Sequence, residues 1–249
     1  MLKNKKVIIF DLDGTLIDSI GVWNDVDKEL VRAICNKEID VIKAGNQRDI
    51  KLKEYSSCEY AYLEYCGFLK EEYNSDMSKE EIKELRSKIA KKLLKERIDY
   101  KPNAEVLLKY LKEKGYILVI ASATNDYVIE IYQNDNKNIK SKANLEDTFS
   151  LIYTAGSVKK LKPDPEIHQK VLNELNVTPE ECLVVEDTLT GIEAARKANI
   201  ETAVMYDKYS DSKRDKINEL SQYQFKDYNE MIEYIKNELG DSNLEKNNG

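Results

Sequence analysis

The stretch VIIFDLDGTLIDS, from Val7 to Ser19, decides the fold because an apolar run ends directly in acidic residues. Residues 7–10 are all bulky and apolar, which is typical of a short strand buried on both faces of a sheet. Asp11 follows immediately, and Asp13 comes two positions later. Carboxylates repel one another, so this pair indicates a site with a chemical reason to hold negative charge at the end of a buried strand.

Apolar strands alternate with amphipathic helices in the second part of the chain. A helix is expected between Asn103, as its cap, and Gly115, as its end. Further strands are expected at 116–121, 149–154, 182–186 and 202–206, and further helices at 166–175 and 190–199. This alternation predicts an α/β fold, a Rossmann-like parallel sheet with helices on both faces. The polar stretch 133–147 is expected to be an exposed loop.

The block between the first strand and residue 99 differs from the rest of the chain in composition and in the spacing of its apolar residues. It is rich in Lys, Glu, Tyr and Leu, it lacks proline, and Ile82, Leu85 and Ile89 recur at helical spacing. Because the strand at 7–10 must join the later sheet, the block is an insertion that forms an all-helical second domain. We therefore expect a discontinuous core domain at 1–17 and 99–239, a helical domain at 18–98 and a disordered tail at 240–249.

The composition of the 249 residues excludes several classes of function. The net charge is −7 and the pI is about 5.1, which argues against nucleic-acid binding because that rests on neutralising phosphates. No apolar run approaches the roughly 18 residues of a membrane helix. The four cysteines have no metal-ligand spacing, so reduced thiols in the cytoplasm are expected. We expect a monomer.

Polar side chains follow each strand, where parallel α/β sheets bind their ligands. Ser122 follows the strand at 116–121, Glu186 and Asp187 stand at the end of the strand at 182–186, and Lys162 lies in the loop KKLKPDP. Burying these carboxylates together with the first two would cost several kcal/mol each, on the order of the penalty for a buried ion, unless a cation joined them. Carboxylate and carbonyl oxygens suit Mg²⁺, so the acidic residues predict a magnesium site.

A nucleophile must then come from the acidic residues. The single histidine, His168, is expected to face solvent or to be hydrogen-bonded in the core. An ionised aspartate beside Mg²⁺ can itself attack phosphorus and form an aspartyl phosphate. A second carboxyl group two residues away can protonate the leaving oxygen and then activate water. The pair Asp11 and Asp13 therefore divides these two roles.

Four motifs in this order closely resemble the haloacid dehalogenase superfamily of phosphotransferases. They are DLDGT, the strand that ends in Ser122, Lys162 with its following proline, and EDTLTG. The helical insertion resembles the cap domain of the branch that contains β-phosphoglucomutase and related phosphatases. The resemblance implies that Asp11 is the nucleophile and a metal ligand, and that Asp13 is the general acid and base, with its backbone carbonyl also on the metal.

The resemblance also assigns the remaining site residues. It implies that Asp187, with Glu186 directly or through water, completes the Mg²⁺ site. The transferred phosphoryl group would be held by Thr15, Ser122, Ala123 and Lys162. The cap carries no motif of this resemblance, but Trp23 and Arg48 in it are expected to face the substrate, with Arg48 available to a second anionic group.

The leading hypothesis is a Mg²⁺-dependent phosphatase of small phosphorylated metabolites. The alternative is a phosphohexomutase such as β-phosphoglucomutase. Mutases of this type usually carry a histidine about twelve residues after the nucleophile, where this chain has Trp23. A non-catalytic protein that binds Mg²⁺ or phosphate would lack one of the two N-terminal aspartates. Dehalogenation is not expected, because dehalogenases of the superfamily lack the carboxylate that this chain keeps as Asp13.

Overall fold

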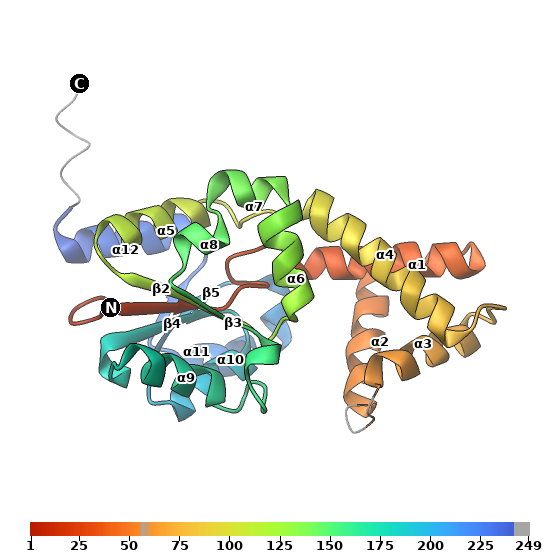
Figure 1. Ribbon diagram of the computed structural model, residues 1–249. Helices are drawn as coiled ribbons and strands as arrows, with labels where there is room; N and C mark the ends of the chain where they lie inside the picture. Colours follow the sequence, from red (N-terminus) through yellow and green to blue (C-terminus); the bar gives the residue numbers. More distant parts are fainter. Residues whose placement is uncertain (56–57, 59, 242–249) are drawn as a thin grey trace. The chain divides into compact units, whose positions relative to one another are not determined.

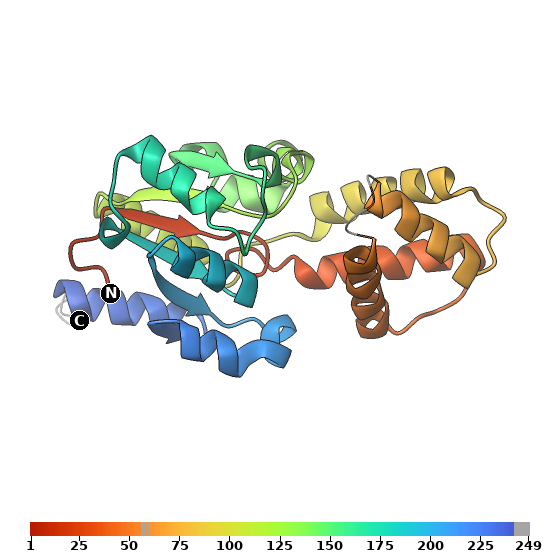
Figure 2. The ribbon, with the colours of Figure 1, turned by 90° about the horizontal axis from the view of Figure 1, so that it is seen from below.

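The computed structural model describes residues 1–55, 58 and 60–241 (Figures 1 and 2). The chain divides into two compact units. The core unit contains Met1–Asp18 and the chain from Asp99 onward, and the cap unit contains Ser19–Ile98. The two connections between the units are hydrogen-bonded to each other, because the backbone amide of Asp18 donates to the carbonyl of Asp99 at 3.1 Å.

The core unit is built on a parallel sheet, as the sequence predicts. The strand order is β3-β2-β1-β4-β5-β6, and every neighbouring pair is parallel. The strands are β1 (Val7–Phe10), β2 (Ile117–Ala121), β3 (Leu151–Tyr153), β4 (Cys182–Glu186), β5 (Glu201–Met205) and β6 (Tyr223–Phe225). The chain fills one side of β1 first and then returns to its other side at β4. The order therefore reverses between β1 and β4, which is where sheets of this class bind their ligands.

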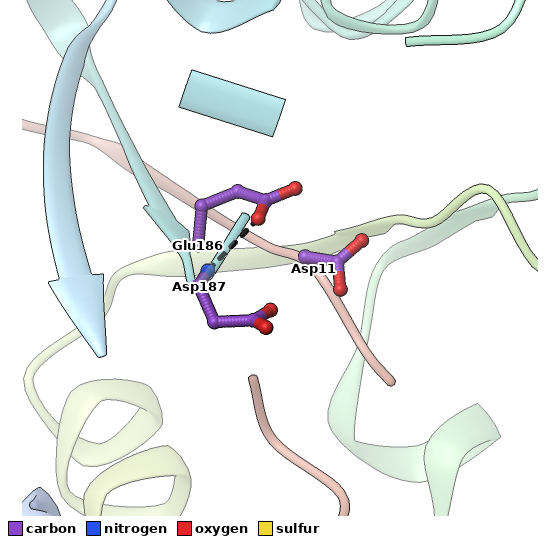
Figure 3. Close-up of side chains that lie close together, drawn as sticks. All are labelled: Asp11, Glu186 and Asp187. Carbon is purple, nitrogen blue, oxygen red and sulfur yellow. Dashed lines mark hydrogen bonds between the residues drawn. The ribbon is translucent and has the colours of Figure 1, made fainter. Parts of the chain in front are cut away.

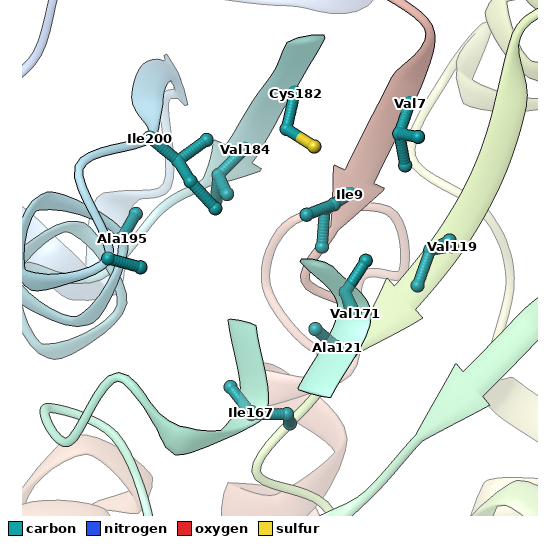
Figure 4. Packing of buried hydrophobic residues seen from close by; sticks show 11 residues of the cluster. Val7, Ile9, Val119, Ala121, Ile167, Val171, Cys182, Val184, Ala195 and Ile200 are labelled. Atoms are coloured by element: carbon teal, nitrogen blue, oxygen red, sulfur yellow. The ribbon is translucent and has the colours of Figure 1, made fainter. Parts of the chain in front are cut away.

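Helices cover both faces of the sheet (Figure 1). One face carries α5 (Ala104–Glu113) and α12 (Tyr228–Leu239), and the other carries α9 (Glu166–Leu175), α10 (Leu189–Lys197) and α11 (Arg214–Leu220). Every residue of β1 is fully buried, which explains its continuous apolar sequence. Figure 4 shows the buried cluster on one face, made of Val7, Ile9, Val119, Ala121, Ile167, Val171, Cys182, Val184, Ala195, Ala198 and Ile200.

The chain between β2 and β3 is folded, so the expectation of an exposed loop at 133–147 is wrong. It forms α6 (Asp126–Glu130), the π-helix η1 (Ile131–Asp135), α7 (Lys137–Lys142) and α8 (Leu145–Thr148). The buried Asn136 caps α7 by accepting a hydrogen bond from the amide of Ile139 at 2.9 Å. Ile139 and Leu145 are fully buried. Two apolar anchors and asparagine caps therefore order a stretch whose composition is polar.

The ends of the core helices differ in part from the expectations. Asn103 stands before α5 in a left-handed conformation, and its side chain donates to Asn229 instead of capping the helix. Gly240 ends α12 with a positive φ of 78°, and Asp241 accepts a hydrogen bond from the Tyr110 hydroxyl. These two residues belong to the tail that we expected to be disordered, and residues 242–249 lie outside the described part. Short 3₁₀ turns complete the unit at η2 (Ala155–Ser157), η3 (Pro179–Glu181) and η4 (Lys208–Lys213).

All the secondary structure described in the cap unit is helical. It contains α1 (Ile20–Cys35), α2 (Val41–Glu54), α3 (Ala61–Glu72) and α4 (Lys79–Arg97). Ser78 and Glu81 form a reciprocal capping box that begins α4. The helices enclose an apolar cluster of Leu30, Tyr65, Cys66, Leu69 and Ile82. Among the residues that the structure describes, we find no helix with the length and apolarity needed to cross a membrane.

Candidate active site

Three carboxylates converge at the carboxyl ends of β1 and β4 (Figure 3). The parallel register places Phe10 beside Val185, so Asp11 and Glu186 are the next residues on adjacent strands. The amide of Asp11 donates to the carbonyl of Val185 at 2.9 Å. One oxygen each from Asp11, Glu186 and Asp187 lies within 4.8 Å of the others. All three residues are buried, so water screens their repulsion little.

Lys162 is the cation that meets this cluster directly. Its Nζ lies 2.7 Å from Oδ1 of Asp11 and 2.7 Å from Oε1 of Glu186. Burial works against the ammonium form, but the carboxylates of Asp11 and Glu186 outweigh it and raise the pKa of Lys162. The lysine is therefore charged at neutral pH and holds two carboxylates from neighbouring strands.

One lysine does not neutralise three carboxylates. Burial, together with the charge of Glu186, raises the pKa of Asp11 to about 7 in spite of Lys162. Burial and the charges of Glu186 and Asp11 likewise raise the pKa of Asp187. The cluster thus has an excess of negative charge in a closed space, which a further cation would relieve.

The donor set fits Mg²⁺. All the candidate ligand atoms in the cluster are carboxylate oxygens, and hard divalent cations prefer oxygen ligands. The side chain of Asp13 is not part of this cluster of three. Its predicted ligand atom is the backbone carbonyl oxygen, so the carboxyl group stays available for the predicted role of general acid and base.

Glu186 is held on both of its oxygens. Oε1 meets Lys162, and Oε2 accepts hydrogen bonds from the amide of Asp187 and from the amide and hydroxyl of Thr188, at 2.8 to 2.9 Å. A Cβ atom at Gly191 would lie 1.7 Å from Oε1, so only glycine leaves room for the carboxylate. This arrangement favours a role for Glu186 in fixing Lys162 beside Asp11.

Thr15 and Gly14 position Asp187. The Thr15 hydroxyl is buried and donates to Oδ1 of Asp187 at 2.7 Å. Gly14 has a φ of 87°, and a Cβ atom there would lie 2.7 Å from Oδ2 of the same carboxylate. The expected contact between Thr15 and the phosphoryl group remains a prediction, because the side chain already has this carboxylate partner.

Asp13 has a partner that the sequence did not indicate. The hydroxyl of Tyr132, from η1, donates to Oδ1 of Asp13 at 2.9 Å. Tyr132 is fully buried, although it directly precedes the polar stretch 133–147 that was expected to be an exposed loop. No role was predicted for Thr188, which follows Glu186 and Asp187 in the EDTLTG motif and donates to Glu186 from both its amide and its hydroxyl.

Ser122 and Ala123 lie directly beyond β2, as expected. Ser122 is buried, its amide donates to the carbonyl of Tyr153, and its Oγ accepts from the amide of Thr124 at 3.2 Å. Ala123 is exposed. The edge of the sheet therefore presents a buried hydroxyl next to an exposed backbone segment, which is consistent with the predicted phosphate contacts.

The two cap residues expected to face the substrate belong to one charged cluster inside the cap unit. Arg48 Nη1 lies 2.6 Å from Oδ2 of the buried Asp27, and Arg86 Nη2 lies 3.2 Å from Oδ1 of the same carboxylate. The guanidinium of Arg86 lies 5.5 Å from the ring centroid of Trp23 and 5.1 Å from that of Tyr62. Arg48 and Trp23 are therefore joined through Asp27 and Arg86, and their contact with a substrate stays a prediction.

His168 departs from both of its expected environments. It is fully buried in α9, and neither ring nitrogen has a hydrogen-bond partner among the described residues. Burial, together with the charge of Lys162, lowers its pKa to about 3. The imidazole is therefore neutral at physiological pH and is not a candidate for proton transfer there.

Comparison with known proteins identifies the family. The model of the haloacid dehalogenase-like hydrolases matches residues 5–199. A phosphorylated carbohydrates phosphatase of Thermotoga maritima is 27% identical over 196 residues, which cover 79% of this chain and 82% of that protein. A phosphoglycolate phosphatase of Aquifex aeolicus is 31% identical over 206 residues, which cover 80% of this chain and 84% of that protein.

Solved structures show the same fold. The crystal structure of a β-phosphoglucomutase from Clostridium difficile aligns with a TM-score of 0.64 and 23% identity, and the alignment covers 95% of this chain and 97% of that one. At this identity the likeness concerns the fold alone. It confirms the predicted α/β architecture. It does not distinguish a phosphatase from a phosphomutase, and that distinction has to come from the chemistry of the site.

Proposed function

Because the chain belongs to the haloacid dehalogenase-like hydrolases, we propose that it is a Mg²⁺-dependent phosphatase of small phosphorylated metabolites. One observation carries the proposal. Asp11 is buried between Lys162 and two further carboxylates, whereas Asp13, two residues away, points its carboxyl group to Tyr132. The two aspartates thus have the separate environments that a nucleophile and a proton carrier need.

In the proposed reaction, Oδ of Asp11 attacks the phosphorus of the ester, and the bond from phosphorus to the leaving oxygen breaks. Asp13 gives its proton to that oxygen, so the alcohol leaves neutral. Asp13 then accepts a proton from the water that attacks the aspartyl phosphate, and inorganic phosphate departs. Both aspartates end in the protonation states in which they started.

The other residues stabilise charge on the transferred group. Lys162, Ser122 and the backbone at Ala123 hold phosphoryl oxygens, and Glu186 keeps the lysine ammonium beside Asp11. Mg²⁺, held by Asp11, Asp187, the carbonyl of Asp13 and Glu186 directly or through water, would supply a Lewis acid that offsets the charge of the phosphoryl oxygens. Thr15 keeps the Asp187 carboxylate in its orientation.

The substrate class rests on the relatives. Those reported above are named for phosphorylated carbohydrates and for phosphoglycolate. Both are small phosphate esters of hydroxylated carbon compounds, and the acidic surface of this chain does not favour a nucleic-acid substrate. We therefore place the substrate among small sugar or organic-acid phosphates.

The test is phosphate release from a panel of sugar phosphates, organic-acid phosphates and nucleotides with Mg²⁺. The expected result is release that stops with EDTA and in Asp11→Asn but persists in Asp215→Asn, which changes an exposed aspartate of α11. Release by Asp11→Asn at the wild-type rate would refute the assignment of the nucleophile.

The mutase alternative has a separate readout. Conversion of β-glucose 1-phosphate to glucose 6-phosphate after addition of a bisphosphate primer, without release of phosphate from any ester, would establish the mutase and overturn the proposed phosphatase. The position of Trp23, where such mutases usually carry a histidine, favours the phosphatase.

A further inference from the structure

The π-helix η1 brings a tyrosine hydroxyl to the proposed proton carrier. Tyr132 is fully buried, and its Oη lies 2.9 Å from Oδ1 of Asp13. The two residues are 119 positions apart in the sequence, so the fold of the whole core unit is needed to join them. A hydrogen bond from a hydroxyl to an ionised carboxylate is stronger than a hydrogen bond between two neutral groups.

The backbone around Tyr132 is built to hold this position. The amide of Asn136 donates to the carbonyl of Ile131 at 2.9 Å, which is the i to i+5 bond of a π-helix. Such widened turns are rare and occur frequently at functional sites, because they shift the direction of the side chains that follow. Beyond the π-helix, the carbonyl of Ala143 accepts from the Tyr100 hydroxyl. The segment is therefore fastened to the rest of the core on the side that follows Tyr132.

We propose that Tyr132 is a positioning residue that orients the carboxyl group of Asp13 for proton transfer. The inference rests on the proposed phosphatase function. The hydroxyl fixes one oxygen of Asp13 and restricts rotation of the carboxyl group, which sets the direction in which Asp13 gives its proton to the leaving oxygen. Tyr132 keeps its own proton throughout the reaction.

The test uses the dependence on the leaving group. General acid–base catalysis contributes about 10²- to 10⁴-fold, and an alkoxide leaving group needs the donated proton whereas p-nitrophenolate departs readily without it. Tyr132→Phe should lower kcat/KM, which includes only the steps up to departure of the alcohol, by about 10- to 100-fold for the best sugar or organic-acid phosphate. With p-nitrophenyl phosphate, kcat/KM should fall by less than about threefold, and hydrolysis of the shared aspartyl phosphate does not enter this comparison.

Two controls keep the result specific. Tyr110→Phe removes another tyrosine-to-carboxylate hydrogen bond, that from Tyr110 to Asp241 at 2.5 Å, and should leave both activities unchanged. In an Asp13→Asn background, Tyr132→Phe should add almost no further loss, because the group it positions is already disabled.

Equal losses of kcat/KM on both classes of substrate, or a full additional loss in the Asp13→Asn background, would overturn the positioning role and assign Tyr132 to packing alone. If wild type hydrolyses the alkyl ester and Tyr132→Phe does so equally well, the inference fails while the phosphatase stands. If wild type hydrolyses no ester, the proposed function fails and this inference falls with it.

Discussion

The buried imidazole of His168 should make the stability of the core unit depend on pH in a calculable way. Its pKa is lowered from 6.5 to about 3 by burial and by Lys162. The unfolded chain binds a proton below pH 6.5, whereas the folded state binds it only near pH 3, so stability is lost as the pH falls below 6.5. pH 5 lies 1.5 units below 6.5, so the loss of stability there is about 2 kcal/mol, at roughly 1.4 kcal/mol per unit.

The informative variant is His168→Leu, which removes the titrating group and also two buried ring nitrogens that have no partner among the described residues. Each such unpartnered buried group costs about 1–3 kcal/mol. Because it removes two such groups, the substitution should raise the free energy of unfolding by about 2–6 kcal/mol at pH 7.5, where the imidazole is neutral in both states. At pH 5 the gain should be about 2 kcal/mol larger.

Urea denaturation of the two proteins at pH 5 and pH 7.5, in EDTA and followed by circular dichroism, measures this difference. Asp11 titrates in both proteins, so its contribution cancels in the comparison. Gln169→Leu, which changes the exposed neighbour on the same helix, should show no such dependence on pH. A gain from His168→Leu that is equal at the two pH values would refute the reasoning, because the imidazole would then remain accessible to protons in the folded state.

Three further predictions follow from contacts in the two units. Gly191→Ala should lower kcat by at least about 100-fold in phosphate-release assays, because its Cβ would lie 1.7 Å from the Glu186 carboxylate that holds Lys162. The control Gly67→Ala, whose Cβ would have its nearest contact at 3.6 Å, should be active. Asp27→Asn should destabilise the cap unit by about 3–5 kcal/mol in urea denaturation, because it leaves two buried guanidinium groups without their carboxylate. Asp25→Asn, which breaks the exposed pair with Arg97, should cost no more than about 1 kcal/mol, and equal effects of the two changes would contradict the argument. Mg²⁺ affinity measured by calorimetry should rise between pH 6 and pH 8, and binding should release protons. Burial raises the pKa of Asp11 to about 7, so the cation must displace the proton of this carboxyl group at the lower pH. An affinity that does not change over this range would be inconsistent with Asp11 as a ligand.

The site residues that follow strands could be predicted because a parallel sheet gathers the carboxyl ends of its strands at one edge. Asp11, Ser122, Glu186 and Asp187 all lie where this rule places them. Lys162 stands in a loop outside the strands. The resemblance implied that it holds phosphoryl oxygens, and its contact with Asp11 was not predicted. The registers of β1 with β2 and β4 then set the side-by-side arrangement that the sequence alone leaves open.

Contacts between side chains that lie far apart in the sequence could not be predicted from local patterns. Tyr132 and Arg86 lie 119 and 59 positions from the carboxylates they contact, and no local spacing marks either pair. The stretch 133–147 was misread because its composition is polar, yet the buried Ile139 and the cap formed by Asn136 are enough to order it. The average polarity of the stretch therefore concealed the two features that order the segment directly after Tyr132.

Covalent labelling tests the central claim, that Asp11 attacks phosphorus, most directly. Wild type and the Asp13→Asn variant, in which loss of the base should slow hydrolysis of the intermediate, would be mixed with the best ³²P-labelled ester and Mg²⁺ and quenched in acid within milliseconds. The account predicts protein-bound phosphate that hydroxylamine releases, on the peptide that contains Asp11, and none in Asp11→Asn. Normal phosphate release by wild type with no labelled peptide in either protein, or a label that persists in Asp11→Asn, would contradict it.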